Sequence, residues 1–265
     1  MIRIAHESPK SVFEDIQRLT DYDYALVHLF EEDEEYLNQF KKAVTKGREV
    51  ILDNSIFELE EAFDAVKFAK WVEVLKPTWY IVPDALEDSE KTIKQMASWN
   101  TQYSKLPGKK IGVVQGKTYN QIKSCYEYMD KVADVDMIAI SFDYSYYTVS
   151  VPHANKYVSW MLGRVKLIGD LLKDGIINKE KPHHLLGCGL PQEFSFYKHA
   201  DYNFIYSLDT SNPVVHGIKG IEYKDIGLWS KESQKLFEMI NSEITLDQFT
   251  YIKTNIEKFR KFTNG

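Results

Sequence analysis

Acidic, amide and hydroxyl side chains stand directly after several short apolar runs of this sequence. Carboxylates that share a pocket repel one another and lose solvent, so one is expected to act as an acid while another stays ionised. Such a pair suits substitution at the anomeric carbon of a sugar, where one carboxylate attacks and the other transfers protons. Each aspartate, taken alone, could equally cap a helix. The set consists of Asp53, Asp84, Gln115, Ser141, Asp143 and Asp209.

Glycines also follow the apolar runs. Gly116 stands after one run, and Gly187 and Gly189 stand after another. A residue without a side chain lets backbone amides approach a flat ligand closely, and it also permits a tight turn at the end of a strand. Both interpretations stay open at this point.

The apolar runs alternate with longer segments of helical periodicity, which is typical of βα units around a parallel sheet. Eight such units in 265 residues predict an α/β fold, a single (β/α)₈ TIM barrel. In barrel enzymes the carboxyl ends of the strands build the active site, and the polar set stands at those ends. The expected strands are 3–5, 24–29, 50–52, 79–82, 111–114, 137–140, 184–186 and 204–208.

Helices are expected between these strands, over 35–45, 60–75, 90–103 and 119–131. The longer connection from 144 to 178 should hold an aromatic loop with one long or two short helices. Residues 222–265 are expected to form a C-terminal helical extension that ends in an amphipathic helix. The whole chain, 1–265, is therefore expected to be one barrel domain.

The composition narrows the class of protein. With 44% hydrophobic residues the chain can bury one large core, and no apolar run is long enough to cross a membrane. Cys125 and Cys188 stand far apart without CxxC spacing, so neither a disulfide framework nor a thiolate zinc site is expected. The net charge of -6 argues against a protein that coats nucleic acid, but it does not exclude a local basic groove formed by clusters of lysines. We expect a cytoplasmic location.

Four segments carry a resemblance to a known family. They are 52–58 (Leu-Asp-Asn-Ser-Ile-Phe-Glu), 112–116 (Gly-Val-Val-Gln-Gly), 184–189 (His-Leu-Leu-Gly-Cys-Gly) and 207–213 (Ser-Leu-Asp-Thr-Ser-Asn-Pro). In this order they resemble the Asp-Ser-Gly-Gly-aromatic-Gln, Val-Gln-Gly, His-Tyr-Leu-Met-Gly-x-Gly and Phe-Asp-Cys-x-x-Pro segments of the tRNA-guanine transglycosylase superfamily. The resemblance is greatest to its shorter branch, which installs 7-deazaguanine bases in DNA.

This resemblance implies a pentosyltransferase that exchanges guanine in DNA for a base such as 7-cyano-7-deazaguanine. Asp209 would be the nucleophile that bonds covalently to the sugar carbon, and Asp53 would be the general acid and base. Asp84 would accept hydrogen bonds from the N–H groups of the guanine edge, and Gln115 would donate to O6. The remaining implied substrate-binding residues are Phe57 and Leu186, which would sandwich the ring, and Ser141, Phe142 and Gly187 near its backbone contacts.

The chain also departs from that family. It lacks the cysteines and the length of the zinc subdomain of the tRNA enzymes, so no metal or other cofactor is expected and DNA is favoured over tRNA. Ser55 and Ile56 replace the two glycines of the first motif, and Glu58 replaces its glutamine. The expected partners are DNA and a small purine or 7-deazapurine base, in a host cytoplasm if a phage encodes the chain. The oligomeric state stays open, a homodimer included.

Two other activities are compatible with the same residues. A nucleosidase or base-exchange enzyme for free nucleotides would keep the glycosyl chemistry and change only the substrate. A metal-dependent barrel hydrolase would use strand-end histidines, but the His-x-His spacing on the first strand is missing. A binding module without catalysis is the non-enzyme alternative.

The tyrosines after the sixth strand, Tyr144, Tyr146 and Tyr147, either stack on exposed bases or pack a surface loop.

Overall fold

The strands of the computed structural model, which describes residues 1–61, 63–232 and 234–265, form one sheet. Within these residues it has eight strands in the order β1-β8-β7-β6-β5-β4-β3-β2. Five neighbouring pairs have a parallel register, for example Ala5 beside Asp209 in β1 and β8. The predicted fold class, an α/β (β/α)₈ TIM barrel with C-terminal helices, is confirmed. The strands are β1 (Arg3–Ala5), β2 (Asp23–Leu26), β3 (Val50–Asp53), β4 (Trp79–Ile81), β5 (Lys109–Val113), β6 (Met137–Ser141), β7 (His183–Leu186) and β8 (Ile205–Asp209).

The contacts divide the chain into two compact units. The first unit comprises Met1–Asp21, Phe142–Asp174 and Leu185–Gly265. The second unit comprises Tyr22–Ser141 and Gly175–His184.

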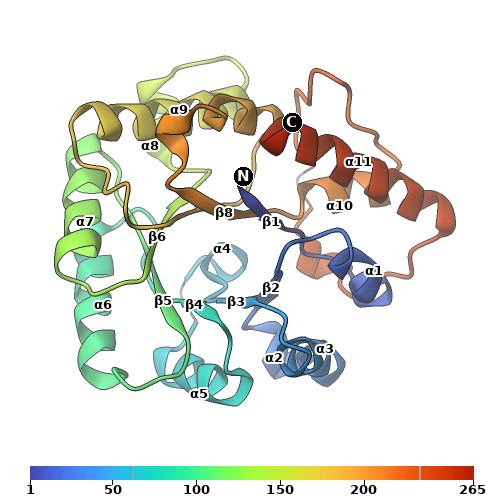
Figure 1. Cartoon of the computed structure of the whole chain (residues 1–265), viewed down its shortest axis with the longest axis horizontal. Helices are drawn as coiled ribbons and strands as arrows, with labels where there is room; N and C mark the ends of the chain where they lie inside the picture. Colours follow the sequence, from blue (N-terminus) through green and yellow to red (C-terminus); the bar gives the residue numbers. More distant parts are fainter. Residues whose placement is uncertain (62, 233) are drawn as a thin grey trace. The chain divides into compact units, whose positions relative to one another are not determined.

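The second unit is a succession of βα elements that contains β2 to β6. Polar side chains begin its helices: Asp33, Asp64, Asp88 and Thr118 each accept a hydrogen bond from a backbone amide in the first turn. Figure 1 shows the longer helices beside the strands they connect. The helices are α2 (Leu29–Glu32), α3 (Glu34–Thr45), α4 (Ile56–Leu59), α5 (Ala65–Leu75), α6 (Ser89–Gln102) and α7 (Tyr119–Lys131).

The helix predicted over 60–75 begins later than expected. Its periodicity is correct from Ala65 onward, but Glu60 adopts a left-handed conformation (φ 63°), which ends the short helix α4. Asp64 then starts α5 by accepting a hydrogen bond from the amide of Lys67 at 2.9 Å. Residue 62, which belongs to the predicted segment, lies outside the described residues. The strand predicted over 24–29 is also shorter, because α2 already begins at Leu29.

The first unit joins β1 and β8 to the helices that follow β6 and β8. The long connection after β6 holds a short helix and a long one, α8 (Ser145–Ser150) and α9 (Lys156–Lys173). Tyr144 and Tyr147 are fully buried, and Tyr147 packs against α9 at Gly163. Of the two alternatives for these tyrosines, stacking on exposed bases is excluded for Tyr144 and Tyr147, because their rings are part of the core. The other helices are α1 (Phe13–Gln17), α10 (Asn212–Ile218) and α11 (Leu246–Asn264), with 3₁₀ turns η1 (Lys10–Val12), η2 (Pro191–Tyr197), η3 (Ala200–Tyr202) and η4 (Leu236–Met239).

The helical extension predicted from residue 222 is only partly correct. The final amphipathic helix exists as α11, which packs its apolar side, including Ile252 and Ile256, onto α10. Between 222 and 235, however, the described residues form no helix. The side chains of Asn155, Gln192 and Asn255 hold this segment in place. Its backbone groups therefore find hydrogen-bond partners without forming a helix.

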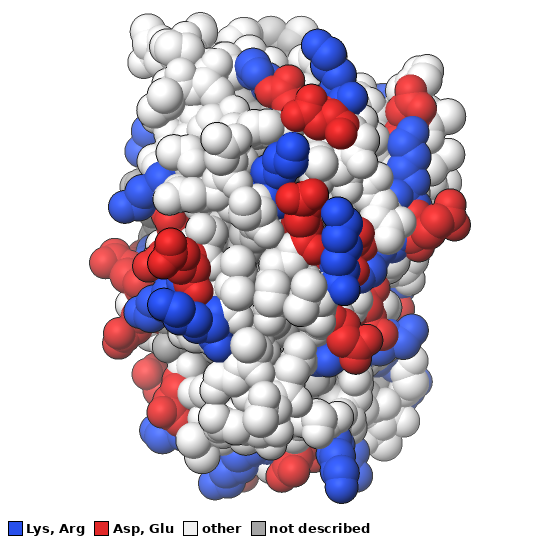
Figure 2. All heavy atoms as spheres, turned by 90° about the vertical axis from the view of Figure 1, so that its left-hand side faces the viewer, with Lys and Arg blue, Asp and Glu red and all other residues white. Residues whose placement is uncertain are grey.

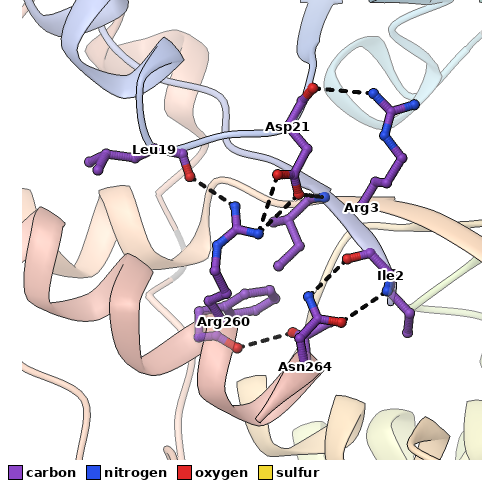
Figure 3. A network of polar contacts seen from close by, with 9 residues as sticks. Ile2, Arg3, Leu19, Asp21, Arg260 and Asn264 are labelled. Atoms are coloured by element: carbon purple, nitrogen blue, oxygen red, sulfur yellow. Dashed lines mark hydrogen bonds and ion pairs between the residues drawn. The ribbon is translucent and has the colours of Figure 1, made fainter.

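Helix α11 also protects the outer edge of β1. The side-chain amide of Asn264 pairs with both the N–H and the carbonyl of Ile2, at 2.9 Å each. The carboxylate of Asp21 accepts from the backbone N–H of Ile4 at 2.8 Å, and Arg260 in turn donates to Asp21 at 3.1 Å (Figure 3). Side chains thus occupy backbone groups that β8 does not use, and an unpaired strand edge is avoided.

The surface in Figure 2 carries blue and red side chains interspersed, without a broad area of one sign. That face therefore offers no continuous basic surface for nucleic acid. None of the helices among the described residues is both long and apolar enough to cross a membrane.

Candidate functional site

Asp53 ends strand β3 in the second unit, and two donors hold its carboxylate. The amide of Ser55 donates to Oδ1 at 2.6 Å, and the hydroxyl of Tyr24 donates to Oδ2. Ser55 has a left-handed backbone (φ 59°), which turns the chain sharply after the strand. Tyr24 comes from β2, and its ring stacks on the buried ring of His184 with centroids 6.1 Å apart. Asp53 is thus a half-buried carboxylate in a fixed orientation.

Asp84 lies at the centre of a second cluster. The amide of Asn54 donates to its Oδ1 and the amide of Gln115 donates to its Oδ2, both at 2.7 Å. Backbone groups orient both amides: Asn54 also donates to the carbonyl of Val82, and Gln115 accepts from the amide of Glu87. The ends of β3 and β5 therefore fix the carboxylate that follows β4.

Burial raises the pKa of Asp84 to about 6, although the hydrogen bonds from Gln115 and Asn54 lower it. The side chain is 2% exposed, so its charge is poorly solvated. Further N–H donors would favour the ionised form. Each carboxylate oxygen can accept more than one hydrogen bond, and Gln115 retains a second N–H, so the cluster can still pair with a ligand that has both donors and an acceptor.

His183, which precedes His184 in β7, has both ring nitrogens hydrogen-bonded within the protein. His183 is buried between the hydroxyl of Tyr126, at 2.8 Å, and the carbonyl of Lys181, at 2.8 Å. Burial lowers its pKa to about 4, so it is neutral at pH 7. This is the environment of a structural core histidine.

Asp209 ends strand β8 in the first unit. The amide of Gly187 donates to its Oδ1 at 3.2 Å. Gly187 has a left-handed backbone (φ 64°), and a Cβ at this position would lie 2.4 Å from Cδ1 of Phe142. Only glycine permits this approach, so Gly187 and Phe142 are brought together as direct neighbours. Leu186, the preceding residue, is half-buried.

A buried ion pair fixes the turn that carries Gly187. Nε of Arg164 donates to Oε1 of Glu193 at 2.6 Å, and both side chains are at most 1% exposed. The two terminal nitrogens of Arg164 donate to the carbonyls of Leu186 (2.8 Å) and Gly187 (3.0 Å). Burial by itself would lower the pKa of Arg164, but the carboxylate of Glu193 reverses this, and the pKa is raised. The guanidinium thus connects α9, η2 and the end of β7.

Lys231 adds a cation near these residues. Its Nζ lies 4.0 Å from the centroid of the Phe142 ring, within the range of a cation–π contact. Burial lowers its pKa, although the carboxylates of Asp143, Glu7 and Asp209 act in the opposite direction. Lys231 therefore lies within the electrostatic range of the carboxylate that ends β8.

The predicted site residues fall in both units. Within the second unit, Asp84 and Gln115 contact one another directly. Phe57, which follows Asp53 in the sequence, is 40% exposed, and Ser141 is the last residue of β6. The first unit holds the others: Phe142, Leu186, Gly187 and Asp209.

Several residues of these clusters were not predicted from the sequence. Tyr24 and Asn54 bond the predicted carboxylates, and Arg164 and Lys231 lie far from them in sequence. Asn54 stands inside the first matched motif and could have been found there. The other three carry no local signal.

Among the described residues, no group of three or more histidine, cysteine, aspartate or glutamate side chains is arranged to hold a metal ion. A scan against protein-family models finds no match to this chain, and a search of curated proteins finds none either.

Proposed function

We propose that this protein is a purine base-exchange enzyme, a pentosyltransferase that replaces guanine in DNA with a 7-deazaguanine such as 7-cyano-7-deazaguanine. The observation that carries the proposal is the cluster of Asp84 between the amides of Asn54 and Gln115. A guanine edge offers two kinds of N–H donor beside the O6 acceptor. A fixed carboxylate next to a fixed amide N–H is complementary to that pattern.

The sequence segments described above support the assignment of the two working carboxylates. Asp209 attacks C1′ of the nucleotide, and the bond from C1′ to the guanine nitrogen breaks with its electron pair on the base. Asp53 supplies a proton to the departing base. The incoming deazapurine then loses a proton to Asp53, attacks C1′, and displaces the carboxylate of Asp209.

The surroundings of each carboxylate suit its role. The amide of Gly187 orients Asp209, while the hydroxyl of Tyr24 and the amide of Ser55 orient Asp53. Orientation of a nucleophile before the reaction lowers the entropic part of its barrier. A base that is hydrogen-bonded to Asp84 would be held through its ring and not through its sugar. The same contacts could then hold the departing base and the incoming base.

The experiment is to incubate the purified protein with guanine-labelled DNA, tRNA or dGTP, each with and without 7-cyano-7-deazaguanine, and to follow released guanine. Release from DNA that depends on the deazapurine is the expected result. Release only from dGTP would favour the enzyme for free nucleotides instead. Release from none of the three would overturn base exchange of guanine.

A further inference from the structure

The loop 222–231, which lies between α10 and α11 in the first unit, is held by side chains at both ends. At its start, the amide of Tyr223 donates to Oδ1 of Asn255 at 2.8 Å, and Nζ of Lys258 donates to the carbonyl of Tyr223 at 2.6 Å. At its end, the hydroxyl of Tyr157 donates to the carbonyl of Lys231 at 3.2 Å. The loop is thus tied to α11 and to α9.

The middle of the loop is held as firmly. The side-chain amide of Gln192 pairs with both backbone groups of Leu228, at 2.6 Å to the carbonyl and 3.1 Å from the N–H. A Cβ on Gly227 would lie 2.1 Å from Oε1 of Gln192, so this pairing requires glycine. Asn155, before α9, donates to the carbonyl of Trp229 at 2.6 Å.

This arrangement presents the side chain of Trp229 to solvent on a fixed backbone. Its backbone is fixed, yet 60% of the residue is exposed. Ordering a loop costs conformational entropy, and exposing an indole forgoes the burial of its large apolar surface. A fixed and exposed aromatic ring is typical of a binding surface.

A lysine stands between the two residues that hold this end of the loop. Lys156 stands between Asn155 and Tyr157, the two residues that hold the carbonyls of Trp229 and Lys231. It is exposed, and its Nζ lies 5.1 Å from the ring centroid of Tyr157. Lys231 lies over the buried ring of Phe142 and is not counted in this surface. An exposed aromatic ring and an exposed lysine held by neighbouring residues match the alternation of bases and phosphates along a nucleic-acid strand.

We propose that Trp229 is a base-stacking platform for a single-stranded or locally opened nucleic-acid strand, with Lys156 beside its phosphates. The inference rests on the proposed function only in taking the substrate to be a nucleic acid. A base within a duplex has to be extruded before it can react, and a neighbouring stacking surface compensates for part of the lost stacking. Tyr144 and Tyr147 are buried and cannot supply that surface.

The test is binding, measured separately from exchange. Fluorescence anisotropy of a labelled oligonucleotide is followed in the full-length Asp209→Asn protein and in the same protein with Trp229→Ala, Trp229→Phe or Ile226→Ala. Ile226 is the matched control, because it is 66% exposed in the same loop but has no ring. The probes are single-stranded DNA, single-stranded RNA of the same sequence, and duplex DNA.

Trp229→Ala should weaken single-strand binding by about 5- to 150-fold, the loss of one stacked base. Trp229→Phe should restore part of it, and Ile226→Ala should bind like the parent. The relative affinities for DNA and RNA identify the strand. Equal binding by the parent and Trp229→Ala, or no binding of any probe, would overturn the proposal. If the stacking effect is seen while the wild-type protein exchanges no base, the proposed function fails and this inference stands.

Discussion

The amide nitrogen of Gly187 lies 3.2 Å from Oδ1 of Asp209, so the turn after β7 donates directly to the carboxylate that ends β8. The position of this amide depends on the left-handed backbone of Gly187 and on the lack of a Cβ, which would lie 2.4 Å from Phe142. Arg164 donates to the carbonyl of the same residue. A distant buried residue thereby contributes to the orientation of the candidate nucleophile.

Substitution of Gly187 by alanine should therefore impair both folding and chemistry. A left-handed backbone costs a residue with a Cβ about 1–2 kcal/mol, and the new methyl group would also overlap Phe142. We expect a lower free energy of unfolding and a base-exchange rate reduced at least about tenfold, measured by denaturant unfolding and guanine release.

Gly220→Ala provides the matched control. Gly220 has a similar φ of 69°, but nothing lies within 4 Å of its added Cβ. It should show the backbone cost and retain the exchange rate per folded molecule. If both variants lost the same amount of activity, the contact between Gly187 and Phe142 would not orient Asp209.

The two carboxylates should differ in their mutant behaviour. Asp209→Asn should abolish the covalent adduct with the sugar, because its side-chain amide is a poor nucleophile. Asp53→Asn should retain binding but slow turnover by about 10²- to 10⁴-fold, the usual contribution of a general acid–base group. Mass spectrometry of acid-quenched protein, together with turnover assays, separates the two. A sugar adduct in Asp209→Asn would refute the assigned nucleophile.

Binding of the free base should depend on pH through Asp84. Burial raises the pKa of this carboxyl to about 6, so it is ionised above that pH and protonated below it. Donors on a bound guanine favour the ionised form, so affinity should be constant above pH 7 and fall as the pH drops through 6. Calorimetric titration with guanine from pH 5 to 8 checks this. A pH-independent affinity would mean that Asp84 does not accept from the base.

The sequence predicted the elements well where local patterning determines them. The run of apolar residues at 137–140 and the periodicity at 119–131 match β6 and α7 to within one residue. The predicted helix start at residue 60 was wrong, because Asp64 caps a helix that begins at Ala65. The local sequence could not show that the segment after 222 is a loop. Side chains from elsewhere in the chain, such as Gln192 and Asn155, hold it in that conformation.

The sequence pattern points to the candidate carboxylates but not to the residues that hold them. Asp84 and Gln115 follow recognisable strands, so their proximity followed from the parallel order. Arg164 reads in the sequence as an ordinary helix residue, and its burial beside Glu193 depends on tertiary packing alone. Single-sequence patterns do not contain such pairs.

The pair of Arg164 and Glu193 provides the last prediction. Removing one partner of a buried ion pair leaves an uncompensated charge and costs about 3–5 kcal/mol, so Glu193→Gln and Arg164→Met should each lower the free energy of unfolding by this order. Arg164→Lys should not restore it, because one ammonium cannot reach the three acceptors that the guanidinium bonds, Glu193 and the carbonyls of Leu186 and Gly187.

The exposed pair of Lys166 and Asp170 on the same helix is the control, and Lys166→Met should cost at most about 0.5 kcal/mol. Urea unfolding of all four variants gives the comparison. Because Arg164 also holds the turn of Gly187, Arg164→Lys should lose base exchange beyond its loss of folded protein. Full exchange per folded molecule in Arg164→Lys would show that the pair stabilises the fold without orienting Asp209.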